Sequence, residues 1–332
     1  MSPSFSKRTI VSLKLVVMGT GRFALPTLIG LCESSHEVVG LFTQPDRTGR
    51  GHHNHVNVMK EAAIERGIPV FQPQNINEHD ALAELKALDA DLAVVAAYGQ
   101  ILAADVLSAP RLGCINLHAS LLPKYRGAAP IQYAVRMGEQ ETGITIFQIE
   151  PKLDAGPILG VVKTPIGEKE SYGELELRLR DLAVPLVVDV VDQIASGTTQ
   201  PVTQDATTIT RAPRLKKSEG EIDWSKTSRL VDCHVRAMQP WPRPFTFLQM
   251  GDQKPLRVLI LEVDDFSDSL PHDAARPGDV FAVDGKRIVA KTGDGAVEVK
   301  SLQPEGKRAM SATEFLNGRT ITSDARFGSL PV

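Results

Sequence analysis

Short apolar runs alternate with amphipathic segments along the first two-thirds of the chain. The apolar runs end in Gly, Pro or polar residues, which is typical of buried strands. They cover residues 14–19, 37–44, 68–72, 90–99, 113–119 and 141–150. Segments with helical spacing follow or separate them, at residues 25–35, 58–67, 78–88, 128–139 and 171–197. This alternation predicts an α/β fold with a doubly wound, mostly parallel sheet and helices on both faces.

The pattern changes after about residue 240. Short apolar runs now follow one another, split by Gly, Asp and Pro turns, at residues 245–250, 256–263, 278–283, 287–291 and 296–304. Such closely spaced strands predict a small β-barrel of the OB-like type. A Ser-x-x-Glu capping pattern opens a long helix at Ser171 and a terminal helix at Ser311. We therefore expect an α/β domain over residues 1–205, a linker over 206–218 and a barrel over 219–332.

Charge changes this picture only locally. The formal net charge of the 332 residues is -3, so overall attraction to nucleic acid is excluded as the basis of binding. Residues 1–205 carry 18 Lys and Arg against 23 Asp and Glu, whereas residues 206–332 carry 19 against 17. The linker includes Arg214, Lys216 and Lys217, which could hold phosphates or could simply be solvated.

Cysteine and apolar content point to a reduced compartment. The three cysteines, Cys32, Cys114 and Cys233, are far apart and show no metal-ligand spacing. No segment reaches the ~18 apolar residues of a membrane span, and the N-terminal stretch has no apolar leader. We expect a bacterial cytoplasmic protein that uses no metal and no membrane, with an organelle matrix as the alternative location.

A glycine-rich turn follows the first strand. Gly19 to Ala24 fits the Gly-x-Gly-x-x-Ala form of the dinucleotide fingerprint. A nicotinamide site also needs an acidic residue that closes the second strand, but this strand ends in Leu-Phe-Thr-Gln and Asp46 lies beyond Pro45. We therefore expect no NAD, and favour a tight turn whose backbone amides lie near a polar or anionic ligand.

The strand at residues 113–119 carries an amide and an imidazole two residues apart. Side chains alternate along a strand, so Asn116 and His118 share one face with Cys114. Two such groups suit an oxyanion that develops during acyl transfer. For an isolated Asn-x-His pattern, however, a polar pair that satisfies strand-end backbone is the more common role. Cys114 lies ~13 Å along the strand from His118, too far to act as its nucleophile.

A carboxylate comes from the loop after the strand at residues 141–150. If the strands are parallel, their loops leave the same end of the sheet and Asp154 can reach His118. An Asp beside a His fixes the tautomer of the ring and stabilises its charged form. The alternative is an ordinary turn residue before Ala-Gly.

These residues carry a resemblance. "CINLHASLLPKYRGAAPIQYAV" and "ETGITIFQIEPKLDAGPIL" resemble the folate-dependent formyltransferase family. "FTQPDR", "EIDWSK", "MQPWP" and "LQPEGKRAMSATEFLNG" are similar to the members of that family that act on methionyl-tRNA. The resemblance covers residues 13–318.

The resemblance implies a donor, an acceptor and a set of site residues. The donor would be 10-formyltetrahydrofolate and the acceptor the α-amino group of initiator methionyl-tRNA. Asn116 and His118 would stabilise the oxyanion, while Asp154 would orient His118 and help to remove the proton of the amine. Folate would contact the turn Ser120, Leu121, Leu122 and Pro123, and the pterin would lie near Ala97, Tyr98, Gly99, Gln100, Leu102 and Lys152. The tRNA would contact Arg47, Arg50, Arg214, Lys216 and Lys217, and we expect a monomer.

The chain departs from the family pattern at two places. Gly21 stands where the family usually has Pro, and His52, His53 and His55 stand where it usually has lysines. The first change produces the dinucleotide-like match, and the second leaves the strength of the tRNA contact open. Three alternatives remain: a related enzyme that uses another acceptor or hydrolyses the donor, a nicotinamide dehydrogenase, and an RNA-binding protein built on an inactive core.

Overall fold

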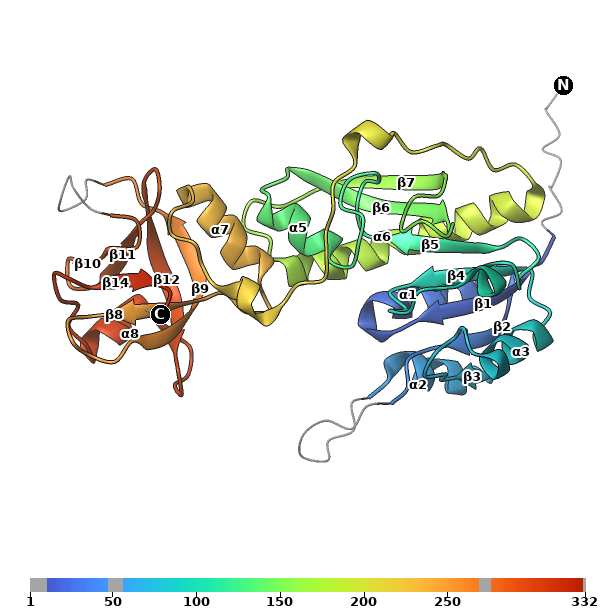
Figure 1. The fold of residues 1–332 in the computed structure, drawn as a ribbon, viewed down its shortest axis with the longest axis horizontal. Helices are drawn as coiled ribbons and strands as arrows, with labels where there is room; N and C mark the ends of the chain where they lie inside the picture. Colours follow the sequence, from blue (N-terminus) through green and yellow to red (C-terminus); the bar gives the residue numbers. More distant parts are fainter. Residues whose placement is uncertain (1–10, 47–55, 269–275, 331–332) are drawn as a thin grey trace, which may run out of the picture. The chain divides into compact units, whose positions relative to one another are not determined.

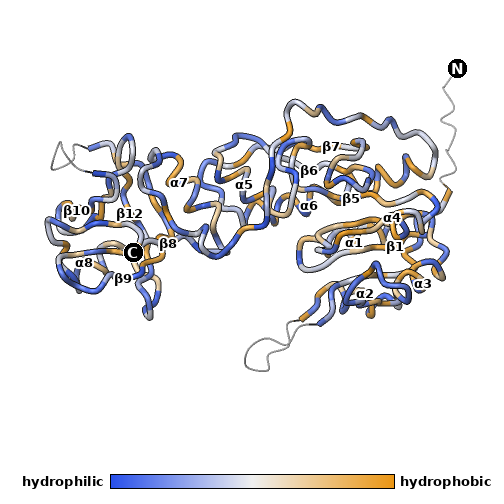
Figure 2. The backbone as a smooth tube through the Cα atoms, viewed as in Figure 1, coloured by the Kyte–Doolittle hydropathy of each residue, from blue (hydrophilic) through white to orange (hydrophobic). Residues whose placement is uncertain are grey.

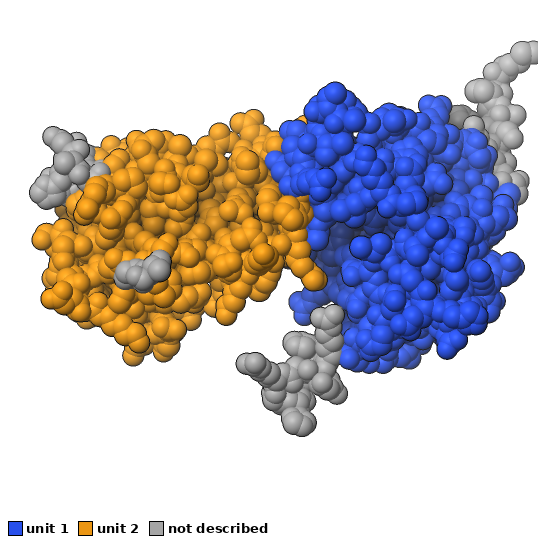
Figure 3. All heavy atoms as spheres, in the orientation of Figure 1, with its two compact units in different colours: residues 1–130, 142–164, 176–211 blue, residues 131–141, 165–175, 212–332 orange. Residues whose placement is uncertain are grey.

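The computed structural model describes residues 11–46, 56–268 and 276–330. Two compact units are interleaved along the chain (Figure 3). Within the described part, the first unit contains the residues up to Pro130 together with Thr142–Thr164 and Glu176–Arg211. The second unit contains Ile131–Glu141, Pro165–Leu175 and the residues from Ala212 onward. Each unit is described by itself below.

The first unit is built on a seven-stranded sheet with the strand order β3-β2-β1-β4-β5-β6-β7 (Figure 1). The strands are β1 Lys14–Gly19, β2 Glu37–Phe42, β3 Val70–Phe71, β4 Leu92–Ala96, β5 Cys114–His118, β6 Glu141–Gln148 and β7 Ile158–Pro165. The five neighbouring strands β3, β2, β1, β4 and β5 pair in parallel, which confirms the predicted doubly wound, mostly parallel sheet. The chain crosses from β1 to β2 on one side and to β4 on the other, so the crevice for a ligand is expected at the carboxyl ends of these strands.

Both faces of this sheet are covered. The helices of this unit are α1 Gly21–Cys32, α2 Val58–Glu65, α3 His79–Ala87, α4 Ala104–Leu107 and most of α6 Tyr172–Ser196. Apart from Pro130, helix α5 Pro130–Arg136 belongs to the second unit. Val16 and Met18 of β1 share a core with Leu85 of α3 and Val106 of α4. Leu15 and Val17, which alternate with these residues in β1, point to the opposite face and are also fully buried. Strand β1 lies in a hydrophobic part of the chain (Figure 2). The apolar strands of the sequence are therefore apolar because neither face meets water.

One strand runs against the expected direction. β6 is antiparallel to β5, with Asn116 opposite Phe147 and His118 opposite Thr145. The loop after β6 therefore begins beside the first residue of β5, where the Ile149 N–H donates to the Cys114 carbonyl at 2.8 Å. The argument that Asp154 would reach the site from the same sheet end as β5 was wrong. Strand β7 and helix α4 were not anticipated from the sequence.

The second unit contains the barrel-like sheet that the sequence predicted. Helix α7 Ser228–Ala237 precedes β8 Phe245–Gln249, β9 Leu256–Asp265, β10 Val280–Val283, β11 Arg287–Lys291, β12 Ala296–Pro304, β13 Met310–Ser311, helix α8 Ala312–Asn317 and β14 Arg326–Gly328. The strand order is β10-β11-β12-β9-β8-β14, and β13 pairs with β12. Val280 N–H donates to Ala325 O at 2.9 Å and Phe327 N–H to Gly278 O at 2.7 Å, so the two outer strands meet and nearly close the sheet.

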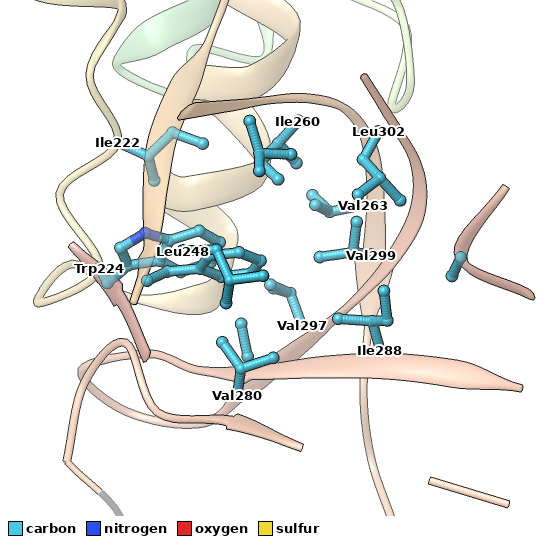
Figure 4. Close-up of a cluster of buried hydrophobic side chains, with 14 of the residues drawn as sticks. Ile222, Trp224, Leu248, Ile260, Val263, Val280, Ile288, Val297, Val299 and Leu302 are labelled. Carbon is cyan, nitrogen blue, oxygen red and sulfur yellow. The ribbon is translucent and has the colours of Figure 1, made fainter. Parts of the chain in front are cut away.

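A dry core fills this barrel (Figure 4). Ile222, Ile260 and Val299 are among its buried side chains, all 4% exposed or less. Trp224 stacks on Phe327 with a ring-centroid distance of 5.1 Å, and its Nε1–H donates to Thr246 Oγ1 at 3.0 Å. The Trp of the "EIDWSK" segment is thus a packing residue, and its one polar atom is satisfied.

Both predicted capping boxes are present. At the start of α6 the Glu174 N–H donates to Ser171 Oγ at 3.3 Å, and the Ser171 N–H donates to Glu174 Oε2 at 2.9 Å. Ser311 and Glu314 repeat the arrangement at the start of α8. No helix in the described part of the chain is long and apolar enough to cross a bilayer.

Candidate active site

The imidazole of His118 is buried at the carboxyl end of β5. Its Nε2 lies 2.9 Å from the carbonyl oxygen of Tyr125, and its Nδ1 lies 3.9 Å from Asp154 Oδ2. The side chains of His118 and Asp154 are 6% and 11% exposed. A carbonyl can only accept, so Nε2 carries the proton of the neutral ring and Nδ1 presents a lone pair toward the carboxylate side.

Asp154 reaches this place by a route that the strand pattern does not show. The loop between β6 and β7 folds back from the far end of β5, and the Gly127 N–H donates to Asp154 Oδ2 at 2.8 Å. Asp154 has a φ of 47°, in the left-handed region that Asp tolerates better than most residues. The predicted meeting of His118 and Asp154 is therefore observed, although the predicted reason for it was wrong.

Burial and charge act on His118 in opposite directions. Burial lowers the pKa of the His118 ring below its ordinary 6.5, while the Asp154 carboxylate raises it and the Arg126 guanidinium lowers it. The burial effect is the largest of these, so the ring is neutral at pH 7. A neutral ring with a free Nδ1 lone pair can accept a proton, and Asp154 then stabilises the imidazolium.

Asn116 lies on the same face of β5 as His118. It is half-buried, and its side-chain amide has no hydrogen-bond partner among the residues that the structure describes. Its two N–H donors therefore remain available to a ligand oxygen. Cys114, on the same face, is buried, and burial raises the pKa of its thiol to about 12, which excludes it as a nucleophile at neutral pH.

The turn after β5 is held by the hydroxyl groups of Ser120 and of Thr145 in β6. Ser120 is fully buried, and its hydroxyl donates to the Lys124 carbonyl at 2.7 Å. The Leu122 N–H donates to Thr145 Oγ1, which in turn donates to the Ser120 carbonyl. Leu121 and Pro123 are half-buried, so they are the members of the predicted folate turn that solvent or a ligand can contact.

The loop after β4 presents backbone rather than side chains. Ala97 and Gly99 are exposed and have φ values of 48° and 81°. Tyr98 and Leu102 are buried, and Gln100 is tied to the chain because its Oε1 accepts from the Ile76 N–H at 2.8 Å. Lys152, in the loop before Asp154, is exposed. In this loop the backbone of Ala97 and Gly99 is the part that a ligand can contact, and the assignment of the loop to a pterin stays a prediction.

The glycine-rich turn is explained by packing. A Cβ on Gly19 would lie 2.9 Å from both the Ala24 side chain and the Ala96 carbonyl, and Gly21 has a φ of 77°. The Gln44 N–H donates to Thr20 Oγ1 at 3.2 Å at the end of β2. Asp46, the nearest acidic residue, pairs with Lys60 at 2.5 Å.

The basic residues predicted to contact RNA lie in two places. Arg214, Lys216 and Lys217 are exposed in the second unit. Arg47, Arg50 and the histidines His52, His53 and His55 lie outside the described residues. Among the described residues, no group of three His, Cys, Asp or Glu side chains is arranged to hold a metal ion.

Two residues of this site have no signal in the sequence. Gln204 lies in a stretch that reads as a polar linker, yet its amide contacts the Asp154 loop and the turn after β5. Tyr125 holds the His118 ring through its backbone carbonyl, which any residue would supply. Its φ of 60° is unusual for Tyr.

Comparison with known proteins identifies the family. The family model described as formyl transferase matches residues 13–191, and the model of the formyl transferase C-terminal domain matches residues 214–320. The chain belongs to the formyl transferase family. It is therefore an enzyme, as the resemblance in the sequence predicted. Both predicted parts of the fold, the α/β sheet and the barrel, correspond to parts of this family.

Close relatives of this formyl transferase extend over nearly its whole length. The methionyl-tRNA formyltransferase of Pseudoalteromonas translucida is 40% identical over 309 residues, covering 93% of this chain and 94% of the relative. The methionyl-tRNA formyltransferase of Methylococcus capsulatus is 41% identical over 310 residues, covering 93% and 98%.

Solved structures share the fold at low identity. An N-formyltransferase from Helicobacter canadensis, in complex with folinic acid and dTDP-3-aminofucose, matches with a TM-score of 0.64 at 16% identity over 86% of this chain and 98% of its own. HypX from Aquifex aeolicus matches with a TM-score of 0.61 at 16% identity. That match covers 94% of this formyl transferase and about half the length of HypX.

Proposed function

We propose that this formyl transferase moves the formyl group of 10-formyltetrahydrofolate to the α-amino group of methionyl-tRNA, giving N-formylmethionyl-tRNA for translation initiation. The observation that carries the proposal is the match at 40–41% identity to methionyl-tRNA formyltransferases over 93% of the chain. The acceptor would be the initiator tRNA, and the protein would act as a monomer in the bacterial cytoplasm. The catalytic domain would cover residues 1–205 and the tRNA-binding domain residues 219–332.

Oxyanion stabilisation is the first part of the chemistry. When the amine attacks the formyl carbon, the carbonyl oxygen gains a full charge, and donors that already point at it lower the barrier. The amide N–H groups of Asn116 would supply such donors. In the neutral ring His118 gives its single N–H to Tyr125, so His118 becomes an oxyanion donor only after Nδ1 takes up a proton.

Proton transfer follows from the same geometry. The attacking nitrogen carries an extra positive charge once its bond to the formyl carbon has formed, and it must lose a proton. The Nδ1 lone pair of His118 accepts that proton, directly or through water, and Asp154 at 3.9 Å stabilises the imidazolium. The proton then passes to the donor nitrogen as the bond between that nitrogen and the formyl carbon breaks, which restores the neutral ring.

The second unit offers a basic and aromatic surface for RNA. Lys217 lines a hollow of about 410 Å³ together with Ser218, Phe245, Phe247, Arg257 and Glu305. The Arg257 guanidinium lies over the Phe245 ring, 4.2 Å from its centroid, and Phe247 is half-buried. Cationic groups beside aromatic faces suit contacts with phosphates and unpaired bases. This surface supports a tRNA substrate over a small acceptor.

A transfer assay tests the proposal. The purified protein is mixed with formyl-folate and one of three acceptors: methionyl-tRNA, free methionine or an amino sugar nucleotide. We expect formyl transfer to methionyl-tRNA at a rate at least ~100-fold above that for the other two acceptors, since tRNA binding energy contributes to positioning the amine. Faster transfer to the sugar nucleotide would instead assign this enzyme to the sugar-modifying formyltransferases.

A further inference from the structure

A strap of residues 202–211 crosses the first unit and is anchored at both ends. Val202 exchanges two backbone hydrogen bonds with Ile158 of β7, each 2.8 Å long. At the other end Thr210 accepts from the turn after β5: its Oγ1 accepts from the Tyr125 N–H at 2.8 Å and its carbonyl from the Arg126 N–H at 3.0 Å. The strap therefore continues the first unit rather than leaving it as a free linker.

Gln204 is the only buried residue of residues 201–210, all of which are described. Its Nε2 donates to the Asp154 carbonyl at 2.9 Å and to the Gly156 carbonyl at 2.8 Å. Its Oε1 accepts from Arg126 Nε at 3.2 Å and Nη2 at 2.7 Å. Both donors and both lone pairs of the amide are satisfied, so the orientation of the side chain is determined by four contacts.

These contacts join the turn after β5 to the loop between β6 and β7. The carbonyl of Tyr125 holds the His118 ring, and the Gly127 N–H holds the Asp154 carboxylate. Arg126 lies between Tyr125 and Gly127 in the chain. Gln204 connects the Arg126 guanidinium to the backbone of Asp154. Asp154 and the turn that holds the His118 ring both lie outside the strands. Strand pairing alone therefore does not set the distance between His118 and Asp154.

We propose that Gln204 is a positioning residue for formyl transfer: it clamps the Asp154 loop to the turn after β5 and so sets the carboxylate beside the His118 ring. The proposal rests on the formyl transfer proposed above. Gln204 acts through Asp154 and touches no reacting atom. A buried, fully hydrogen-bonded amide in an otherwise exposed strap fits this role because an apolar side chain would leave two carbonyls and a guanidinium without their partner.

The test compares two glutamines of like chemistry. Gln204→Ala removes the clamp, and Gln239→Ala is the matched control, because Gln239 Nε2 also donates to two backbone carbonyls, those of Val235 and Leu261, in the second unit. We expect kcat to fall about 10–100-fold in Gln204→Ala, with smaller changes in KM for either substrate, since a displacement of about 1 Å has this effect. Gln239→Ala should keep the kcat of the folded protein within about threefold of the wild-type value, because this change affects only folding.

Two further readouts separate positioning from a loss of folding. In an Asp154→Asn background, the Gln204→Ala change should cost less than about threefold, because its effect passes through Asp154. Titration of His118 by NMR should give a lower ring pKa in Gln204→Ala than in the wild type. The groups that face this ring are the Asp154 carboxylate, which raises its pKa, and the Arg126 guanidinium, which lowers it.

Gln204→Glu keeps the acceptor for Arg126 and loses the donors to the two carbonyls, so it should lower kcat in the same way while preserving size. Wild-type kcat in either folded variant, or equal losses in the Gln204 and Gln239 variants, would overturn the proposal, as would failure of both Gln204 variants to fold. If the wild type itself transfers no formyl to methionyl-tRNA, the proposed function fails, and the His118 titration still decides whether Gln204 holds Asp154 in place.

Discussion

Among the described residues three histidines are buried, His36 and His118 in the first unit and His234 in the second, and the last two differ in what their second ring nitrogen faces. His118 in the first unit and His234 in the second are 5% and 8% exposed. Each pairs Nε2 with a backbone carbonyl, Tyr125 at 2.9 Å and Gly220 at 3.3 Å. Burial lowers the pKa of both rings. The second nitrogen of His118 faces a carboxylate beside a free amide, whereas His234 has no carboxylate within ion-pair distance among the described residues.

The comparison shows that burial and a shifted pKa do not by themselves identify a functional histidine. Both features are expected of any imidazole packed against a helix or strand. What distinguishes His118 is that three groups from two segments lie in one region: the Asn116 amide and the His118 ring from β5, and the Asp154 carboxylate from the loop after β6. His234 belongs to helix α7 and helps to join that helix to the segment around Gly220.

The largest expected effect comes from removing the converging groups. Asn116→Ala, His118→Ala and Asp154→Ala should each lower the formyl transfer rate by about 10²–10³, because each removes a donor or a charge used at the transition state. His234→Gln, which keeps a donor for Gly220, should retain the wild-type rate. Single-turnover transfer to methionyl-tRNA measures this, and near-normal rates in two of the three site variants would remove the distinction between the histidines.

The second prediction concerns stability in acid. Burial lowers the pKa of His234 to about 4 from 6.5. Below pH 6.5 the unfolded chain binds a proton that the folded chain does not, so the free energy of unfolding falls as the pH drops toward 4. The contribution of His234 to this loss in the free energy of unfolding is about 3 kcal/mol once the pH has dropped to about 4. His234→Gln should flatten this dependence in denaturant titrations at pH 7, 5.5 and 4.5; an unchanged slope would mean that His234 is protonated in the folded state.

The third prediction concerns the pH dependence of catalysis. Transfer needs the neutral ring of His118, whose pKa burial has lowered below 6.5. The acceptor amine, with a pKa of ~8, must also be neutral to attack, so the rate divided by the fraction of neutral amine should fall about tenfold per pH unit below the lowered pKa of His118. Asp154→Asn removes the charge that raises the pKa of the ring, so the acid limb of its residual activity should move to lower pH. An acid limb that stays at the wild-type pH would show that Asp154 does not face His118 during turnover.

The smallest effect is expected on the exposed surface of the second unit. Arg214→Ala combined with Lys217→Ala removes two cations that we assign to phosphate contacts. The slope of log Kd for tRNA against log salt should become shallower by about one to two, with no change in the rate at saturating tRNA. Lys226→Ala, which removes an exposed lysine paired with Asp223, serves as the control. Equal slopes for the wild type and the double variant would mean that these residues are only solvated.

How far the sequence predicts the site depends on the distance over which each group is placed. Asn116 and His118 lie on one strand, and the two-residue period of a strand puts them on one face without further information. Asp154 is separated from them by a reversal of strand direction, and the parallel arrangement assumed for β6 was wrong. Gln204 was missed because a polar residue among polar residues shows no pattern, and only the contacts of its amide reveal that it is buried.

The amino-acid sequence by itself determined the α/β sheet, the barrel and the polar face of β5, because hydrophobic periodicity, turn residues and caps act over a few neighbouring residues. It also determined the membership of the formyl transferase family, since "CINLHASLLPKYRG" and the second-domain segments are specific strings. Only the tertiary structure decided the direction of β6, the return of Asp154 to the His118 ring and the inward turn of Gln204. These depend on backbone hydrogen bonds between segments far apart in the chain, which no local pattern encodes.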